Sequence, residues 1–240
     1  MVNYTHILKI MDEYVEKCSV TLKSIRQQIS PIIKNITDTE EEYNTLMEVI
    51  PKFYRDNWNN PKEHLLMQGN KGDIFENEGT EGSVSTPNEA VIESLKNGLV
   101  LSIHNHPSDS TAYQSLGDYV TQCVGTKEKY GITISKKDGV VISKLNSKQV
   151  GRNKLSNTYN KIYKKMGDNF DKDKKAEIQS LKDDYHANKI TLDQINEKYN
   201  DLFHEHMSEN IHEYVNTLNT GFSNNNIPVN VYHAPIKRGG

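Results

Sequence analysis

The chain has 240 residues, a formal net charge of −3 and a sequence pI near 6.3. This balance gives no electrostatic reason to expect nucleic-acid binding, since phosphate backbones are bound by clustered basic surfaces. Only 35% of the residues are hydrophobic and 25% are charged. No apolar run approaches the roughly 20 residues that span a bilayer, and the N-terminus lacks the apolar core of a signal peptide. We therefore expect a cytoplasmic protein with no membrane partner.

Two amphipathic patterns predict an N-terminal helical region over residues 1–60. Apolar residues recur every three or four positions from Ile7 to Ile29, and again from Tyr43 to Ile50. This is the spacing of one helical face. Pro31 and Pro51 directly follow these patterns and are expected to interrupt the helices.

Residues 61–147 are predicted to form an α/β domain. A hairpin is expected around the turn sequence Asn70–Asp73, and a helix is expected to begin near Pro87. The run Leu99–Ile103 is continuously apolar, which is typical of a strand buried on both faces. Two further strands are expected on either side of an Asp-Gly pair at Asp138, because this pair favours a tight hairpin turn.

The C-terminal part returns to charged helical sequence, and residues 148–220 are predicted to form a helical arm. Thr191–Gln194 has the form of a capping box that opens a last helix. Two helices packed together would bury the apolar stripes of this region, and we expect the arm to bind a protein partner or the substrate. Residues 221–240 include Pro228 and Pro235 and are predicted to be a flexible tail.

Two histidines, His104 and His106, come at the end of the apolar strand, where Pro107 cannot extend the sheet. Residues two apart on a strand point the same way, so the pair presents two imidazoles to one point. Catalytic zinc typically takes three protein ligands and leaves one position for water. Asp118, at the start of the next predicted helix, is the candidate third ligand, and the loop carboxylate Asp109 is the alternative.

A second His-x-His sequence lies within the predicted arm, at His204-Glu205-His206. On a helix, residues two apart diverge by about 200° and cannot share a metal ion. We therefore expect no metal site from this pair.

The motif His104-Asn105-His106-Pro107-Ser108, followed by Ser115-Leu116-Gly117-Asp118, resembles that of the JAMM or MPN-plus (JAB domain) zinc metalloproteases. The closest form is that of the bacterial and viral RadC-like branch, and the resemblance covers roughly residues 61–146. It implies a mixed sheet flanked by helices, as in the cytidine-deaminase-like fold, and a Zn²⁺ ion held by His104, His106 and Asp118. The stretch 107–117 is one residue longer than is usual in the family, so the loop must absorb an insertion.

The resemblance also implies two catalytic residues, a general base and an oxyanion donor. Glu63, directly before the strand that begins at His64, matches the position of the base. Three glutamates between residues 76 and 81 are nearer to the motif in sequence, but they lie in an acidic, glycine-containing stretch that is typical of an exposed loop. Ser115 matches the serine that stabilises the oxyanion, and it equally fits a helix N-cap.

These features predict a zinc-dependent metallopeptidase or isopeptidase that uses a zinc-activated water and a glutamate base. Its substrate would be a protein, such as a ubiquitin-like conjugate or a peptide precursor, and the sequence also leaves phage or cell-wall material open. The alternative is a non-catalytic scaffold, such as a phage or mobile-element structural protein that docks partners. An amidohydrolase barrel also uses a His-x-His pair, but such barrels need about 250 residues.

Overall fold

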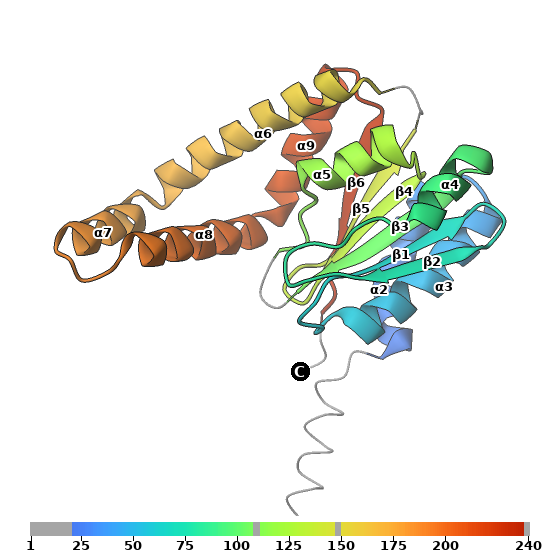
Figure 1. The fold of residues 1–240 in the computed structure, drawn as a ribbon, viewed down its shortest axis with the longest axis horizontal. Helices are drawn as coiled ribbons and strands as arrows, with labels where there is room; N and C mark the ends of the chain where they lie inside the picture. The colour runs from blue at the N-terminus through green and yellow to red at the C-terminus, as the bar shows by residue number, and fades with distance from the viewer. Residues whose placement is uncertain (1–20, 108–110, 147–149, 238–240) are drawn as a thin grey trace, which may run out of the picture.

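The computed structural model describes residues 21–107, 111–146 and 150–237. Within these ranges a six-stranded mixed sheet is flanked by eight helices (Figure 1), which confirms the predicted α/β class. The strands are β1 (His64–Gly69), β2 (Ile74–Glu78), β3 (Leu99–His106), β4 (Tyr130–Ser135), β5 (Gly139–Leu145) and β6 (Val229–Ala234). The helices are α2 (Leu22–Ile36), α3 (Glu40–Asn57), α4 (Asn88–Lys96), α5 (Leu116–Val120), α6 (Arg152–Asp173), α7 (Lys175–His186), α8 (Leu192–Glu209) and α9 (Ile211–Asn224). None of them is long and apolar enough to cross a membrane.

The strand order is β2-β1-β3-β4-β5-β6, with β3 and β4 parallel and every other neighbouring pair antiparallel. Both predicted hairpins are present. Gly72 in the first turn and Gly139 after the second have φ angles of +89° and +92°, which a residue without a Cβ adopts most readily. The sheet is open and mixed, so it is not the closed parallel barrel of an amidohydrolase.

The predicted helix ends at Pro31 and Pro51 are wrong, because α2 and α3 run through both prolines. A proline removes one helical hydrogen bond and crowds the preceding turn. Here Ile29 and Ile33 of α2, and Ile50 of α3, are completely buried on either side of the prolines. Packing of this apolar face outweighs the local cost. The earlier part of the first predicted helix lies outside the described residues.

The predicted flexible tail is wrong over Val229–Ala234, which forms β6 and pairs antiparallel with β5. Pro228 and Pro235 lie just outside the strand ends, where no ladder hydrogen bond is lost. The arm between β5 and β6 contains four helices rather than two, and α6, α7 and α8 extend away from the sheet (Figure 1). The capping box at Thr191 is confirmed at the start of α8.

The sheet has a different cover on each face (Figure 1). Helices α2 and α3 pack on one face against aliphatic residues of β3, β4 and β5, including Leu101, Ile103 and Ile132. On the other face α5, α6 and α9 pack together with β6 and Val141 of β5. Because successive strand residues point to opposite faces, Ser102 belongs to this second face together with the histidine pair.

Candidate metal centre

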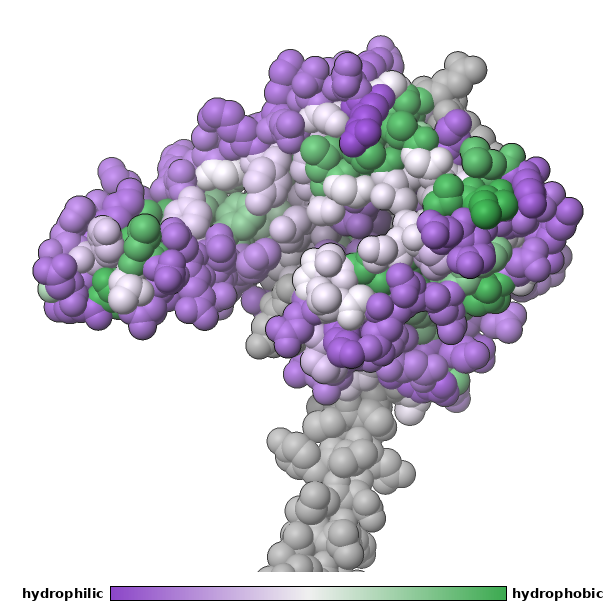
Figure 2. Space-filling model, in the orientation of Figure 1, coloured by the Kyte–Doolittle hydropathy of each residue, from purple (hydrophilic) through white to green (hydrophobic). Residues whose placement is uncertain are grey.

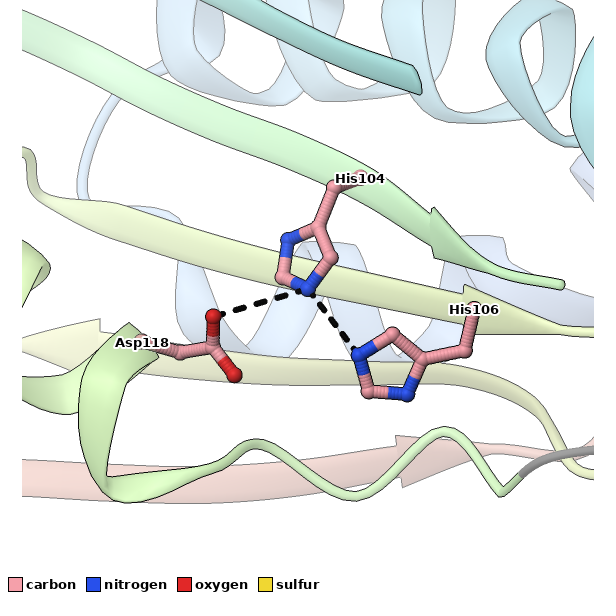
Figure 3. A group of neighbouring side chains, drawn as sticks. All are labelled: His104, His106 and Asp118. Carbon is pink, nitrogen blue, oxygen red and sulfur yellow. Dashed lines mark hydrogen bonds and ion pairs between the residues drawn. The ribbon is translucent and has the colours of Figure 1, made fainter. Parts of the chain in front are cut away.

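Strand β3 delivers two imidazole rings to one point above the second face of the sheet. His104 and His106 project from the end of the strand towards each other (Figure 3). Their Nε2 atoms are 3.2 Å apart. Two nitrogens that each lie about 2.0–2.1 Å from one tetrahedral zinc ion are separated by roughly 3.3 Å. The spacing of the two rings therefore suits a shared ion.

Asp118 of α5 faces the same point. Its Oδ1 lies 3.5 Å from Nε2 of His104 (Figure 3), and one ligand atom from each of the three side chains lies within 4.8 Å of the others. The structure thus brings together His104, His106 and Asp118, and their donor set fits zinc. The alternative ligand, Asp109, lies outside the described residues.

The carboxylate of Asp118 is oriented by the first turn of its own helix. Ser115 is the N-cap of α5, and its Oγ accepts a hydrogen bond from the backbone N–H of Asp118 over 3.3 Å. In return, Oδ2 of Asp118 accepts the backbone N–H of Ser115 at 2.7 Å and its hydroxyl at 2.8 Å. This capping box engages Oδ2 and leaves Oδ1 directed at the imidazoles.

His106 is held in one tautomer. Its Nδ1–H donates to the carbonyl oxygen of Thr111 over 2.7 Å, so the lone pair is on Nε2, the atom that faces His104. Desolvation of the ring lowers the pKa of His106, and the charge of a protonated His104 lowers it further. Both effects favour the neutral imidazole, which is the form that binds a metal.

Glu63 lies directly before β1 and lines the same cleft as the three donors. Only 9% of the residue is exposed. Burial raises the pKa of its carboxyl, His104 opposes this rise, and Asp118 adds to it. A carboxyl whose pKa moves up towards neutrality is suited to accept and return a proton.

The other glutamates considered as bases lie in different places. Glu76 and Glu78 belong to the edge strand β2, not to a loop as predicted, and they line a separate groove beside α3. Glu81 follows β2, is exposed and lines the cleft of Glu63. Of the four glutamates, only Glu63 is both buried and placed at this cleft.

The loop that joins the histidines to Asp118 is held by the helical arm. The carbonyl oxygen of Gln114 accepts the hydroxyls of Tyr159 from α6 and Tyr214 from α9, each at 3.0 Å. Asp138 accepts the backbone N–H of Ala112 at 2.7 Å, and its other oxygen accepts the hydroxyl of Ser208 from α8. The arm is therefore part of what positions the third ligand.

A cleft of about 580 Å³ opens beside the three donors, and the surface is hollowed next to α5 (Figure 2). Its lining includes Tyr113, Glu128 and His204, none of which was predicted as part of the site. The ring of His204 on α8 stacks on Tyr113 with centroids 5.9 Å apart. No local sequence pattern marks these residues, because the cleft assembles them from three distant segments.

Comparison of the chain with models of protein families, with curated proteins and with solved structures finds no match in any of the three.

Proposed function

We propose that this chain is a zinc-dependent peptidase or isopeptidase of the JAMM type. The observation that carries the proposal is the convergence of His104, His106 and Asp118 on one point, with the buried Glu63 in the same cleft. The mixed sheet with helices on both faces is consistent with the fold of that family. The resemblance of the His-x-His-Pro and Ser-x-x-Asp sequences to the motif of that family also supports the proposal.

Hydrolysis in this cleft requires a group that accepts a proton as water attacks and then donates it as the leaving nitrogen departs. Zinc held by the three side chains would supply a Lewis acid that acidifies water and polarises the scissile carbonyl. Glu63 takes a proton from the attacking water as the new C–O bond forms. It then delivers that proton to the leaving nitrogen as the C–N bond breaks, giving a carboxylic acid and an amine.

Ser115 is proposed as the donor to the oxygen that becomes negative. Its hydroxyl lines the cleft, but in this structure it donates to Asp118. It therefore has to turn from the carboxylate to the substrate oxygen during the reaction. Loss of one such donor costs about 3–4 kcal/mol in other enzymes, whereas loss of a helix cap costs about 1 kcal/mol of stability. Because Ser115 also orients Asp118, a loss of hydrolysis in Ser115→Ala supports the donor role only if the zinc content is unchanged.

Metal content and hydrolysis of Glu63→Gln test the proposal. The purified wild-type chain should carry about one zinc ion, since three ligands form one site. The variant should keep the metal and lose hydrolysis by roughly a hundredfold or more, because only the proton acceptor is removed. Glu76→Gln is the matched control and should keep both, because Glu76 lines the other groove. A wild-type chain that binds no zinc would contradict the proposal.

The proposed substrate is a cytoplasmic protein that carries a peptide or isopeptide bond, such as a ubiquitin-like conjugate or a peptide precursor. Glu63→Gln protein should retain this substrate uncut. Mass spectrometry of what it captures from a cell extract, compared with capture by a Glu63→Gln/His104→Ala protein, would identify the bond.

A non-catalytic docking role is the second candidate, and one observation favours it. Helix α4 exposes Val91, Ile92 and Leu95, the last to 80%, and hydrophobic residues gather there on the surface (Figure 2). Exposed apolar patches commonly mark protein contacts. If this role alone is correct, Leu95→Ser should abolish partner capture, while Glu63→Gln should change nothing that is measured.

A further inference from the structure

The cleft contains a carboxylate that the proposed reaction does not use. Glu128, in the segment before β4, lines the cleft although only 1% of the residue is exposed. Its Oε1 accepts the hydroxyl of Ser102 at 2.8 Å, and its Oε2 accepts the hydroxyl of Thr126. Among the described residues, no cationic side chain forms an ion pair with it. A buried carboxylate with neutral partners alone is costly, which suggests that a cation from outside completes the site.

Glu128 lies beside the metal donors in the cleft, because its partner Ser102 is on the same strand as His104. Ser102 and His104 are two residues apart on β3, a separation of about 6.6–6.8 Å along a strand. On the neighbouring strand β1, Leu65 pairs with His104 and Met67 pairs with Ser102. The floor of the cleft therefore runs from the imidazoles, past two buried apolar side chains, to the carboxylate.

This order of groups matches a lysine side chain. From the reacting carbonyl at the metal donors, an aliphatic chain would pass over Leu65 and Met67 and bring an ammonium group to Glu128. We propose that Glu128, Ser102 and Met67 form a specificity subsite for a lysine adjacent to the scissile bond. The inference rests on the proposed function, and it narrows the substrate to a protein segment with a free lysine beside the cleavage point.

Lysine fits better than arginine because of the bonds that Glu128 already makes. Each carboxylate oxygen already accepts one hydroxyl, so a guanidinium binds with two parallel hydrogen bonds only if the remaining acceptor position of both oxygens faces the cleft. An ammonium needs only one free acceptor position and leaves both hydroxyls in place. The long methylene stem of lysine also covers apolar surface while its charge stays hydrated or paired.

A binding experiment without catalysis tests the subsite. The zinc-loaded Glu63→Gln chain is titrated by NMR with Nα-acetyl-lysine N-methylamide and with its norleucine and arginine counterparts. We expect the lysine probe to bind about tenfold tighter than norleucine, as for a hydrogen bond between charged groups. Equal binding of lysine and norleucine, or a preference for arginine, would overturn the inference. This comparison needs no change at Glu128 and so does not depend on the folding of a variant.

Two further variants locate the recognition. Adding Glu128→Gln to the Glu63→Gln chain should remove the lysine preference, with folding checked by its circular dichroism melt. Adding Glu81→Gln should keep the preference, since Glu81 lines the same cleft but is exposed. A preference lost with Glu81→Gln and kept with Glu128→Gln would place the cation at Glu81 and refute the subsite.

Cleavage by the wild-type chain separates this inference from the proposed function. A proteome-derived peptide mixture, generated with a Glu-specific protease, is incubated with the zinc-loaded protein and its cut sites are read by mass spectrometry. Lysine should be enriched at one position next to the cut bond. Cleavage without that enrichment refutes the subsite and leaves the hydrolase standing. Lysine-selective binding without any cleavage supports a lysine-binding site at Glu128 but refutes hydrolysis of linear peptides beside it.

Discussion

The central sheet has one face covered by α2 and α3 and another covered by α5 and the arm. Successive residues of β3 and β4 point to these two faces in turn, and the two faces receive side chains of different polarity. The first face carries buried aliphatic side chains: Leu101, Ile103, Ile132 and Ile134. The second carries polar ones: Ser102, His104, Thr133 and Ser135. Alternation over residues 101–104 and 132–135 thus separates an apolar layer from a layer able to hold a metal.

The two faces also differ in what holds them together. Aliphatic burial stabilises by roughly 25 cal/mol per Å² without any directional requirement. Buried polar groups are costly unless each finds a hydrogen-bond partner. On the second face those partners come from distant segments. Gln122, for example, accepts the hydroxyl of Ser143 at 2.6 Å and donates to its carbonyl at 3.0 Å. The candidate site therefore depends on many specific hydrogen bonds, whereas the aliphatic side chains of β3 and β4 on the other face depend on volume and shape.

The largest expected effect is on zinc content, and it should distinguish His106 on the second face from His64 on the first. His106→Ala should reduce zinc content from about one ion per chain to near zero and abolish hydrolysis, because two ligands do not retain catalytic zinc. His64→Ala is the control. His64 lines the groove beside α3 and its ring contacts Asn60 at 2.8 Å. The measurement is the zinc content of both variants after dialysis. Loss of zinc in His64→Ala would place the metal elsewhere.

The next effect is on stability and should leave the metal in place. Ile103→Ala removes a fully buried side chain from the apolar face and should lower the free energy of unfolding by about 2–5 kcal/mol. The zinc content of the folded protein should not change, because Ile103 points away from the imidazoles. Val100→Ala, a partly buried position packed on the same core, should cost less. Urea denaturation measures both, and equal costs would show that the two sites are packed alike.

The sequence predicted what is encoded by neighbouring residues. The turn at Asn70–Asp73, the hairpin at Asp138 and the capping box at Thr191 each depend on a few adjacent side chains. The pairing of His104 with His106 follows from the period of a strand. The convergence of Asp118 with that pair was expected from a motif, and the structure shows the geometry.

What the sequence did not reveal depends on distant contacts. In β6 the buried positions are Val229, Val231 and Ala234, a pattern too short to outweigh the flanking prolines until β5 is present to pair with it. Likewise His204 is brought to the cleft by α8, and Glu128 by the segment before β4, where it accepts the hydroxyl of Ser102 of β3. Helix propensity was overruled in the same way at Pro31 and Pro51, where burial of the helix face prevails.

A smaller effect tests whether the arm positions the site. Tyr214→Phe removes one of two hydroxyls that bind the carbonyl of Gln114 and should cost about 1 kcal/mol of stability. Tyr159→Phe/Tyr214→Phe should cost more than the sum of the single changes, because the carbonyl then loses both donors. Tyr163→Phe, at a 39% exposed position on α6, is the control. Additive losses would mean that the two hydroxyls contribute to stability independently of each other.

The smallest effect concerns the pH dependence of stability through Glu128. Burial raises the pKa of this carboxyl above its ordinary 4.5, while the hydroxyls of Thr126 and Ser102 act in the opposite direction. The folded chain therefore holds this proton more tightly than the unfolded chain, so the contribution of Glu128 to stability falls as pH rises above about 4.5 and levels off above the raised pKa. Glutamine has no proton to lose. The free energy of unfolding of Glu128→Gln minus that of the wild type should consequently increase from pH 4.5 towards neutral pH, as measured by urea denaturation at several pH values. A difference that stays constant would show that the carboxyl titrates alike in both states, and adding the lysine probe at neutral pH should reduce the difference by stabilising the wild type alone.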